Sequence, residues 1–153
     1  MNELDSFDIS ILKILQSDNY TPQKDIGAEI GLSAPAVQRR IKRLTSIGLI
    51  RKNVALLDQG KLGNLITIIV EVGMERDKLV DVEEAKSNFR NSPAVQQCYY
   101  VTGNADFMLV IIVPNMHEYE LLTHQLFFSN PNIKHFKTYV TMDLVKTSTE
   151  IPF

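Results

Sequence analysis

The N-terminal third of the chain has apolar residues at the spacing of amphipathic helices. These residues recur every three or four positions, in three separate runs. The runs are Leu4, Ile11, Leu12 and Leu15, then Ile26 and Ile30, then Val37, Ile41 and Leu44. Thr21-Pro22 and Ser33-Ala34-Pro35 are typical helix starts, and Gly48 is a typical helix end. The pattern predicts three short helices.

The segment after the third helix is short and partly β-branched. Residues 49–57 include Arg51 and Lys52, and their composition predicts a wing, either a strand pair or an extended arm beside the helices. Gly60 and Gly63 then indicate a linker. We therefore place a first domain at residues 1–58, a linker at 59–64 and a second domain at 65–153.

Beyond the linker, strand-like and helix-like segments alternate. Residues 65–72, 95–101, 107–113 and 136–144 have the composition or the alternation of strands, whereas 79–89 and 116–126 have helical spacing. The order, βαββαβ, is that of ferredoxin-like domains. Helices cover only one face of such a sheet, so an apolar second face needs a partner chain, and we expect a homodimer.

Composition narrows the class of protein. The 153 residues carry a net charge of −2, with 44% hydrophobic and 22% charged residues. This balance is typical of globular proteins, and it requires any polyanion site to be local. The apolar runs are far shorter than the roughly 18 to 20 residues that span a bilayer. The acidic N-terminus lacks a secretory signal, so we expect a cytoplasmic protein.

A local basic surface is predicted on the third helix. The segment 39–52 has no acidic residue, and its basic residues are Arg39, Arg40, Lys42, Arg43, Arg51 and Lys52. On a helical wheel, Arg39 and Arg43 point together, away from the buried stripe and toward base edges or phosphates of a bound duplex. Arg40 falls nearer the buried stripe. We predict that it pairs with Asp25 or Glu29, with a DNA backbone contact as the second choice.

The arrangement of the second and third helices points to DNA. The helix at 23–30, the short Gly31-Leu32 turn and the capped third helix match a helix-turn-helix, whose second helix enters the major groove. The predicted DNA-binding residues are Ser33, Pro35, Ala36, Gln38, Arg39, Lys42, Arg43 and Arg51. Two alternatives remain: a merely solvated basic face, or a stand-alone amino-acid sensor or assembly module whose N-terminal helices bind protein.

With both halves in view, the chain resembles the Lrp/AsnC family, the feast/famine transcriptional regulators, over nearly its full length. Four segments in order carry the resemblance: LDSFDISILKILQSD, DIGAEIGLSAPAVQRRIKRLTSIGLIRK, YVTGNADFMLVIIVPNM and TYVTMDLVK. The resemblance implies an α+β protein with a winged helix-turn-helix and a ferredoxin-like effector domain. It also implies dimers that assemble to tetramers or octamers, with an amino acid bound where dimers meet.

The family's Gly-x-x-Asp effector loop corresponds to Gly103 and Asp106. The glycine allows a sharp turn whose N–H groups can bind a carboxylate, and Asp106 can take an α-ammonium group. The expected effector site is Tyr100, Thr102, Gly103, Asn104, Ala105, Asp106 and, by resemblance, Phe128. The apolar Phe128 favours an apolar effector such as leucine or methionine. Without the resemblance, the same loop is a simple hairpin turn.

Catalytic patterns are missing from the sequence. His117, His124 and His135 form no HxH or HExxH motif, and the single cysteine, Cys98, cannot complete a zinc cluster. There is no GxSxG, P-loop or GxGxxG motif. We therefore expect that the protein is not an enzyme and that it has no cofactor, metal site or membrane partner. Double-stranded DNA and an amino acid are the expected ligands.

Overall fold

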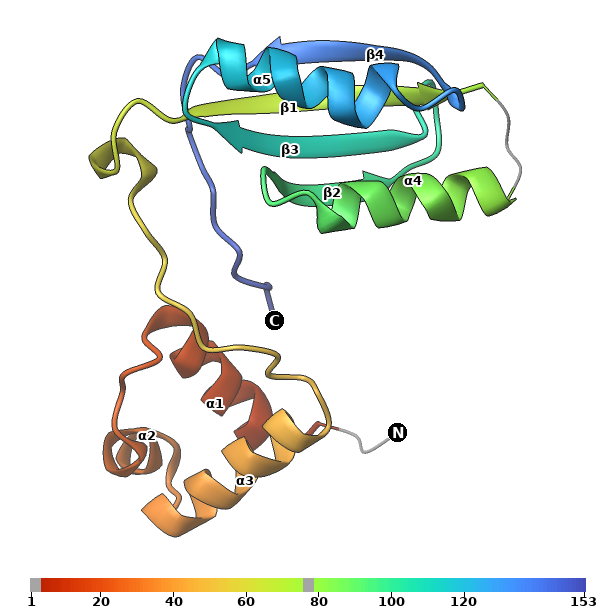
Figure 1. Ribbon diagram of the computed structural model, residues 1–153. Helices are drawn as coiled ribbons and strands as arrows, with labels where there is room; N and C mark the ends of the chain where they lie inside the picture. The colour runs from red at the N-terminus through yellow and green to blue at the C-terminus, as the bar shows by residue number, and fades with distance from the viewer. Residues whose placement is uncertain (1–3, 76–78) are drawn as a thin grey trace. The chain divides into compact units, whose positions relative to one another are not determined.

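The computed structural model describes residues 4–75 and 79–153, and it divides into two compact units (Figure 1). Unit 1 comprises Met1–Leu56 together with Lys146–Phe153, and unit 2 comprises Leu57–Val145. Residues 146–153 were predicted to belong to the second domain. They group with unit 1 because the side chain of Gln16 forms two hydrogen bonds with the backbone of Ile151, at 3.1 and 2.8 Å.

Unit 1 contains the three predicted helices, α1 (Ser6–Ser17), α2 (Gln23–Ile30) and α3 (Ala34–Ser46). Helix α1 begins with a reciprocal capping box, in which the side chains of Asp5 and Asp8 each accept a hydrogen bond from the other's backbone N–H. The apolar stripes of the helices meet in one core, where Ile11, Ile26, Val37 and Leu44 are fully buried.

The turn between α2 and α3 depends on glycine. Helix α2 is capped at its C-terminal end by Gly31, whose φ of 75° lies in the left-handed region. The N–H of Leu32 then donates to the carbonyl of Gly27 at 2.9 Å. A Cβ on Gly27 would lie 2.3 Å from the carbonyl oxygen of Leu32, so no larger residue fits there without moving the backbone. This close approach lets α3 start immediately after α2.

The segment after α3 is an extended arm. No strand is assigned at any of residues 51–58, so the strand pair considered for this wing does not form. The predicted linker, residues 59–64, contacts the rest of unit 2. It contains a short 3₁₀ helix, η1 (Gln59–Lys61), and the Gln59 side chain donates to the Thr67 hydroxyl at 3.0 Å. This contact ties the linker to the first strand of unit 2.

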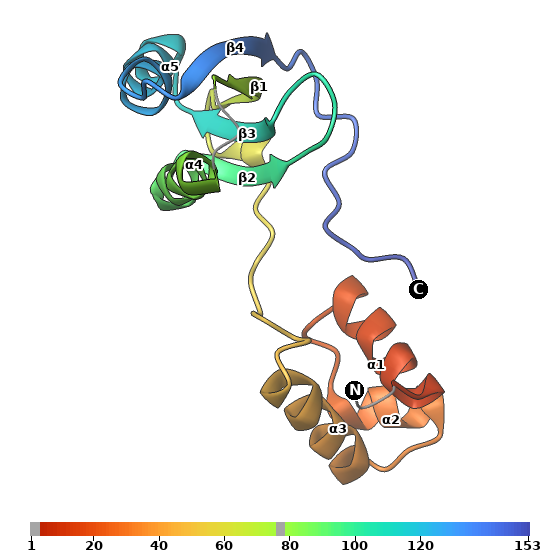
Figure 2. The ribbon, with the colours of Figure 1, turned by 90° about the vertical axis from the view of Figure 1, so that its right-hand side faces the viewer.

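Unit 2 has the predicted ferredoxin-like order. Its elements are β1 (Ile66–Met74), α4 (Leu79–Asn91), β2 (Val95–Tyr100), β3 (Phe107–Val113), α5 (Met116–Thr123), the π-helical turn η2 (His124–Phe128) and β4 (Ile133–Val140). The strand order is β2-β3-β1-β4, with every neighbouring pair antiparallel. Helices α4 and α5 lie on the same face of the sheet (Figure 2).

The last strand differs from its prediction. It was expected at residues 136–144, but it begins at Ile133 and ends at Val140. Its register on β1 explains the earlier end, because Val140 pairs with Ile68, two residues after β1 begins. A strand continued to residue 144 would extend past the end of its partner.

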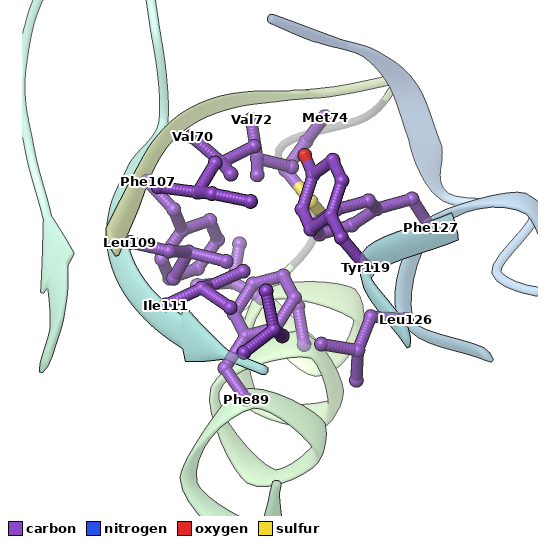
Figure 3. Close-up of a cluster of buried hydrophobic side chains, with 14 residues drawn as sticks. Val70, Val72, Met74, Phe89, Phe107, Leu109, Ile111, Tyr119, Leu126 and Phe127 are labelled. Carbon is purple, nitrogen blue, oxygen red and sulfur yellow. The ribbon is translucent and has the colours of Figure 1, made fainter. Parts of the chain in front are cut away.

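The core of unit 2 lies between the sheet and the two helices (Figure 3). Strand β3 alternates strictly, so that Phe107, Leu109, Ile111 and Val113 face the helices and are buried. The ring of Phe107 packs edge-on against Phe89 of α4, with centroids 5.3 Å apart. This packing fixes β3, and with it the loop that connects β2 to β3.

Neither α4 nor α5 covers the opposite face of the sheet (Figure 2). This face has an apolar centre, flanked by the Glu71–Lys137 ion pair and by Thr67, which is bound by Gln59 of η1. At its centre Ile69 of β1 lies opposite Val110 of β3 and Tyr139 of β4. Ile69 is 36% exposed and Tyr139 46% exposed. We call this surface, with Tyr99 of β2, the open sheet face. It is the face of the sheet that was predicted to need a partner chain.

Candidate DNA-binding helix and effector loop

Helix α3 presents a polar, basic face to solvent. Val37 and Leu44 are fully buried in unit 1, which turns the other side of the helix outward. On that side Ser33, Pro35, Gln38, Arg39 and Lys42 are exposed, and Ala36 is half-buried. Arg51 is exposed in the arm that follows. The eighth predicted DNA-binding residue, Arg43, is partly exposed, and it differs from the others in its ion pair with Asp8.

Arg40 and Arg43 point toward α1. Arg40 Nη1 lies 2.7 Å from Asp5 Oδ2 and 2.9 Å from Asp8 Oδ1, and Arg43 Nη2 donates to Asp8 Oδ2. The predicted partners of Arg40, Asp25 and Glu29 on α2, are wrong because this side of α3 faces the start of α1. Arg43 leaves α3 on the same side as Arg39, and its side chain is 32% exposed, but its guanidinium turns to Asp8. We call Asp5, Asp8, Arg40 and Arg43 the α1–α3 ion cluster.

Asp8 is ionised at the centre of this cluster. Burial of its side chain, which is 1% exposed, acts to raise the pKa of Asp8. Hydrogen bonds from Arg43, Arg40 and the Asp5 N–H outweigh the burial and hold that pKa below its ordinary value. The pKa of Asp5 is also lowered, first by the hydrogen bond from the Asp8 N–H and then by Arg40. The carboxylates in turn raise the pKa of Arg40.

Sequence reasoning did not identify Asp5 and Asp8 as functional residues. Two carboxylates three residues apart before an apolar run are an N-terminal capping signal, and this signal was available. Nothing in the local sequence shows that arginines more than thirty residues later would form hydrogen bonds with these carboxylates.

The candidate effector loop, residues 101–106, connects β2 to β3. Gly103 has a φ of 131°, which is in the left-handed region and requires glycine. The N–H of Val101 donates to the Asp106 carbonyl at 2.9 Å and closes the loop. Thr102, Gly103 and Asn104 are exposed, so their backbone groups are accessible to a ligand.

Asp106 has a structural role that the sequence did not reveal. Its Oδ2 accepts a hydrogen bond from the N–H of Met74 at 2.6 Å, and its own N–H donates to the Val72 carbonyl at 2.9 Å. Both contacts attach the loop to the end of β1. Asp106 is therefore accounted for even if the loop is only a hairpin turn. Its other carboxylate oxygen, Oδ1, forms no hydrogen bond with any of the described residues.

The structure splits the predicted effector site between two edges of the sheet. Tyr100 is on edge strand β2, where Lys86 lies 4.8 Å from the centre of its ring. Phe128 lies by the other edge strand, β4, and packs against Phe136 at 5.4 Å. Register places Tyr100 and Phe136 in one row across four strands, so these two residues are roughly 14 Å apart. Phe128 thus does not reach the loop of its own chain.

Other kinds of site receive no support. Within residues 4–75 and 79–153, no group of His, Cys, Asp and Glu side chains could hold a metal ion. No helix in these ranges has the length and apolar character of a membrane span. The Cys98 thiol, at the edge of the sheet, has a pKa raised by burial, which makes it a poor nucleophile.

A helix-turn-helix with an exposed basic second helix, joined to a ferredoxin-like unit, defines a two-domain DNA-binding regulator. Family models agree with both halves. The Lrp/AsnC ligand binding domain matches residues 67–151, and a winged helix-turn-helix DNA-binding domain matches residues 4–51. The chain belongs to the Lrp/AsnC family of transcriptional regulators. It is a DNA-binding regulator and not an enzyme, and the protein-binding alternative is not favoured.

Similar proteins include an uncharacterised HTH-type transcriptional regulator of Sinorhizobium fredii, 41% identical over 98% of this chain and 89% of the relative. A leucine-responsive regulatory protein of Haemophilus influenzae is 33% identical over 94% of this chain and 86% of the relative. A crystal structure of a transcriptional regulator in complex with L-Met, from Neisseria meningitidis, has the same fold. It is 23% identical with a TM-score of 0.87, and the match covers 98% of this chain and 97% of that one.

Proposed function

We propose that the protein binds duplex DNA sequence-specifically through α3, and that an apolar amino acid such as leucine or methionine controls this binding. The observation that carries the proposal is the outer face of α3. Arg39 and Lys42 are exposed there, on a helix whose opposite side is fully buried. In a helix-turn-helix, this is the face that enters the major groove.

The individual contacts follow from side-chain chemistry. Arg39 and Lys42 bind base edges or phosphates, and Gln38 can bond an adenine edge. Ser33, Pro35 and Ala36 lie in the first turn of α3 or just before it, close to the duplex. Arg51 binds a phosphate from the arm. Arg43 is left out of this set because its guanidinium is bound to Asp8.

The effector loop supplies groups for both ends of an amino acid. The backbone N–H groups of residues 103–105 bind its carboxylate, and Asp106 Oδ1 attracts its ammonium group. Phe128 lies at the far edge of the sheet in its own chain. It therefore lines the site only if a second chain brings it there. The names of two relatives, one leucine-responsive and one bound to L-Met, support an apolar effector.

Assembly is part of the proposal. The open sheet face, with Ile69, Val110 and Tyr139 at its centre, is the dimer interface, because an uncovered apolar face on a sheet is unfavourable in water. Dimers place two copies of α3 on one duplex. Contacts between dimers then complete the effector site, which requires a tetramer or octamer.

In vitro selection from random-sequence duplexes tests the proposal. The full-length protein should enrich a motif with two half-sites spaced by roughly 10 base pairs or a multiple. The double variant Arg39→Gln/Lys42→Gln should enrich nothing, whereas Lys134→Gln, which removes an exposed charge from unit 2, should behave as wild type. Leucine or methionine should then change the affinity for the selected duplex. The absence of any enrichment by the wild type would refute the proposed function.

A further inference from the structure

We propose that Asp8 is a positioning residue for DNA binding. It holds Arg43 and Arg40 against α1, so the charge that α3 offers to a duplex comes from Arg39 and Lys42. This inference rests on the proposed function, because it states which cations of the helix-turn-helix take part.

The hydrogen bonds of Asp8 show why it can hold both arginines. Its side chain is 1% exposed, and both of its oxygens are occupied. Oδ1 accepts from Arg40 Nη1 at 2.9 Å, and Oδ2 accepts from Arg43 Nη2 and from the Asp5 N–H, the latter at 3.2 Å. A buried carboxylate is tolerated only with such partners. Moving Arg43 to a phosphate would take one of them away.

The α1–α3 ion cluster is electrically balanced. It contains two carboxylates, Asp5 and Asp8, and two guanidinium groups, Arg40 and Arg43. A balanced cluster displaces few counterions from DNA, whereas an unpaired cation displaces nearly one per phosphate. In the part of the chain that the structure describes, no ion pair involves Arg39 or Lys42. The charges of these two side chains are therefore not neutralised by a carboxylate and can neutralise phosphates of a duplex.

Arg43 nevertheless lies next to Arg39 on the surface of α3. The two residues are four apart on α3, so their side chains leave the helix on the same side. A hollow of about 500 Å³, lined by residues that include Arg39, Arg43, Asp8 and Ala36, adjoins the cluster. It gives the Arg43 guanidinium room to turn outward once the negative charge of Asp8 is removed. The carboxylate of Asp8 on α1 therefore determines the direction of the Arg43 side chain.

The test is the salt dependence of binding to one non-specific duplex, measured by fluorescence anisotropy with the full-length protein. The slope of log K against log salt is negative. We expect Arg39→Gln to make it less steep by about 0.9, and Arg43→Gln to leave it unchanged. Asp8→Asn should make the slope steeper by about 0.9 through release of Arg43, and by up to twice that if Arg40 is also released. The double variant Asp8→Asn/Arg43→Gln should lose the extra steepness that the released Arg43 adds to the slope. If Asp8 had a purely structural role, Arg43→Gln would not reverse the effect of Asp8→Asn.

Arg43→Gln alone decides the outcome if Asp8→Asn does not fold. A loss of about 0.9 in its slope, equal to that of Arg39→Gln, would overturn the inference. So would a double variant that keeps the full slope of Asp8→Asn. A wild-type protein that binds no duplex would instead refute the proposed function, and this inference with it.

Discussion

The carboxylate of Asp106 accepts a hydrogen bond from the backbone N–H of Met74 at 2.6 Å. This contact joins the candidate effector loop to the end of β1, across more than thirty residues of sequence. Asp106 therefore has two roles in this account: one oxygen supports the loop, and the other is proposed to attract the ammonium group of an amino acid. The two roles require different properties of the side chain.

Substitutions at Asp106 separate these roles. Asp106→Asn keeps an oxygen that can accept from Met74 but removes the charge, so we expect nearly unchanged stability and at least tenfold weaker binding of leucine or methionine. Asp106→Ala removes both and should also cost about 1 to 2 kcal/mol of unfolding free energy. Calorimetry and urea unfolding measure the two effects. Wild-type effector affinity in the Asn variant would show that the pocket assignment is wrong.

Acid should destabilise unit 1 through the α1–α3 ion cluster. The pKa values of Asp5 and Asp8 are lowered in the folded protein, so both carboxyls contribute stability above their unfolded pKa of about 3.9 and lose it as the pH falls through their folded pKa. We expect the free energy of unfolding to be independent of these groups between pH 7 and about 5 and to fall below about pH 4. Hydrogen exchange of amides in α1 and α3 reports this fall.

Asp8→Asn is the matched variant for this pH dependence. At pH 7 it should cost about 2 kcal/mol, because it leaves Arg43 without a carboxylate and leaves Arg40 with only that of Asp5. The cost is below that of a fully buried pair, since the Arg40 and Arg43 side chains are 27% and 32% exposed. The variant should also lose part of the acid-dependent fall. If the free energy of unfolding had the same pH dependence in wild type and variant, Asp8 would not contribute to acid destabilisation.

A charge on the open sheet face should break the proposed dimer. Ile69 lies between Val110 and Tyr139, so Ile69→Glu would place a carboxylate in the middle of an apolar interface. We expect the dimer dissociation constant to rise at least a hundredfold in analytical ultracentrifugation. Val80→Glu is the control, because Val80 is 76% exposed on α4, which lies on the opposite face. Equal effects of both variants would place the interface elsewhere.

Local patterns in the sequence were sufficient for most of the fold. The stripes that include Ile11, Ile26, Val37 and Leu44 predicted three helices because each stripe had to be buried, and the structure buries these residues completely. Alternation along β3 predicted the face that contacts the helices. The end of β4 could not be predicted in this way, because it depends on where its partner β1 begins.

The candidate sites were less predictable, because their contacts join distant parts of the chain. The exposure of Arg39 and Lys42 follows from the helical wheel alone. The direction of Arg43 does not, since it depends on Asp8 of another helix. The hydrogen bond between Asp106 and Met74 likewise requires the pairing of β1 with β3. Phe128 was placed by family resemblance, and the distance between its edge of the sheet and the loop is visible only once the strand order is known.

The salt dependence of duplex binding by wild type and by Arg39→Gln/Lys42→Gln tests the central claim, that the outer face of α3 binds DNA. We predict that wild-type affinity falls steeply with added salt. The double variant should make the slope of log K against log salt less steep by about 1.8, whereas Lys134→Gln should leave it unchanged. An affinity insensitive to salt, or a slope that is the same in wild type and the double variant, would contradict the claim.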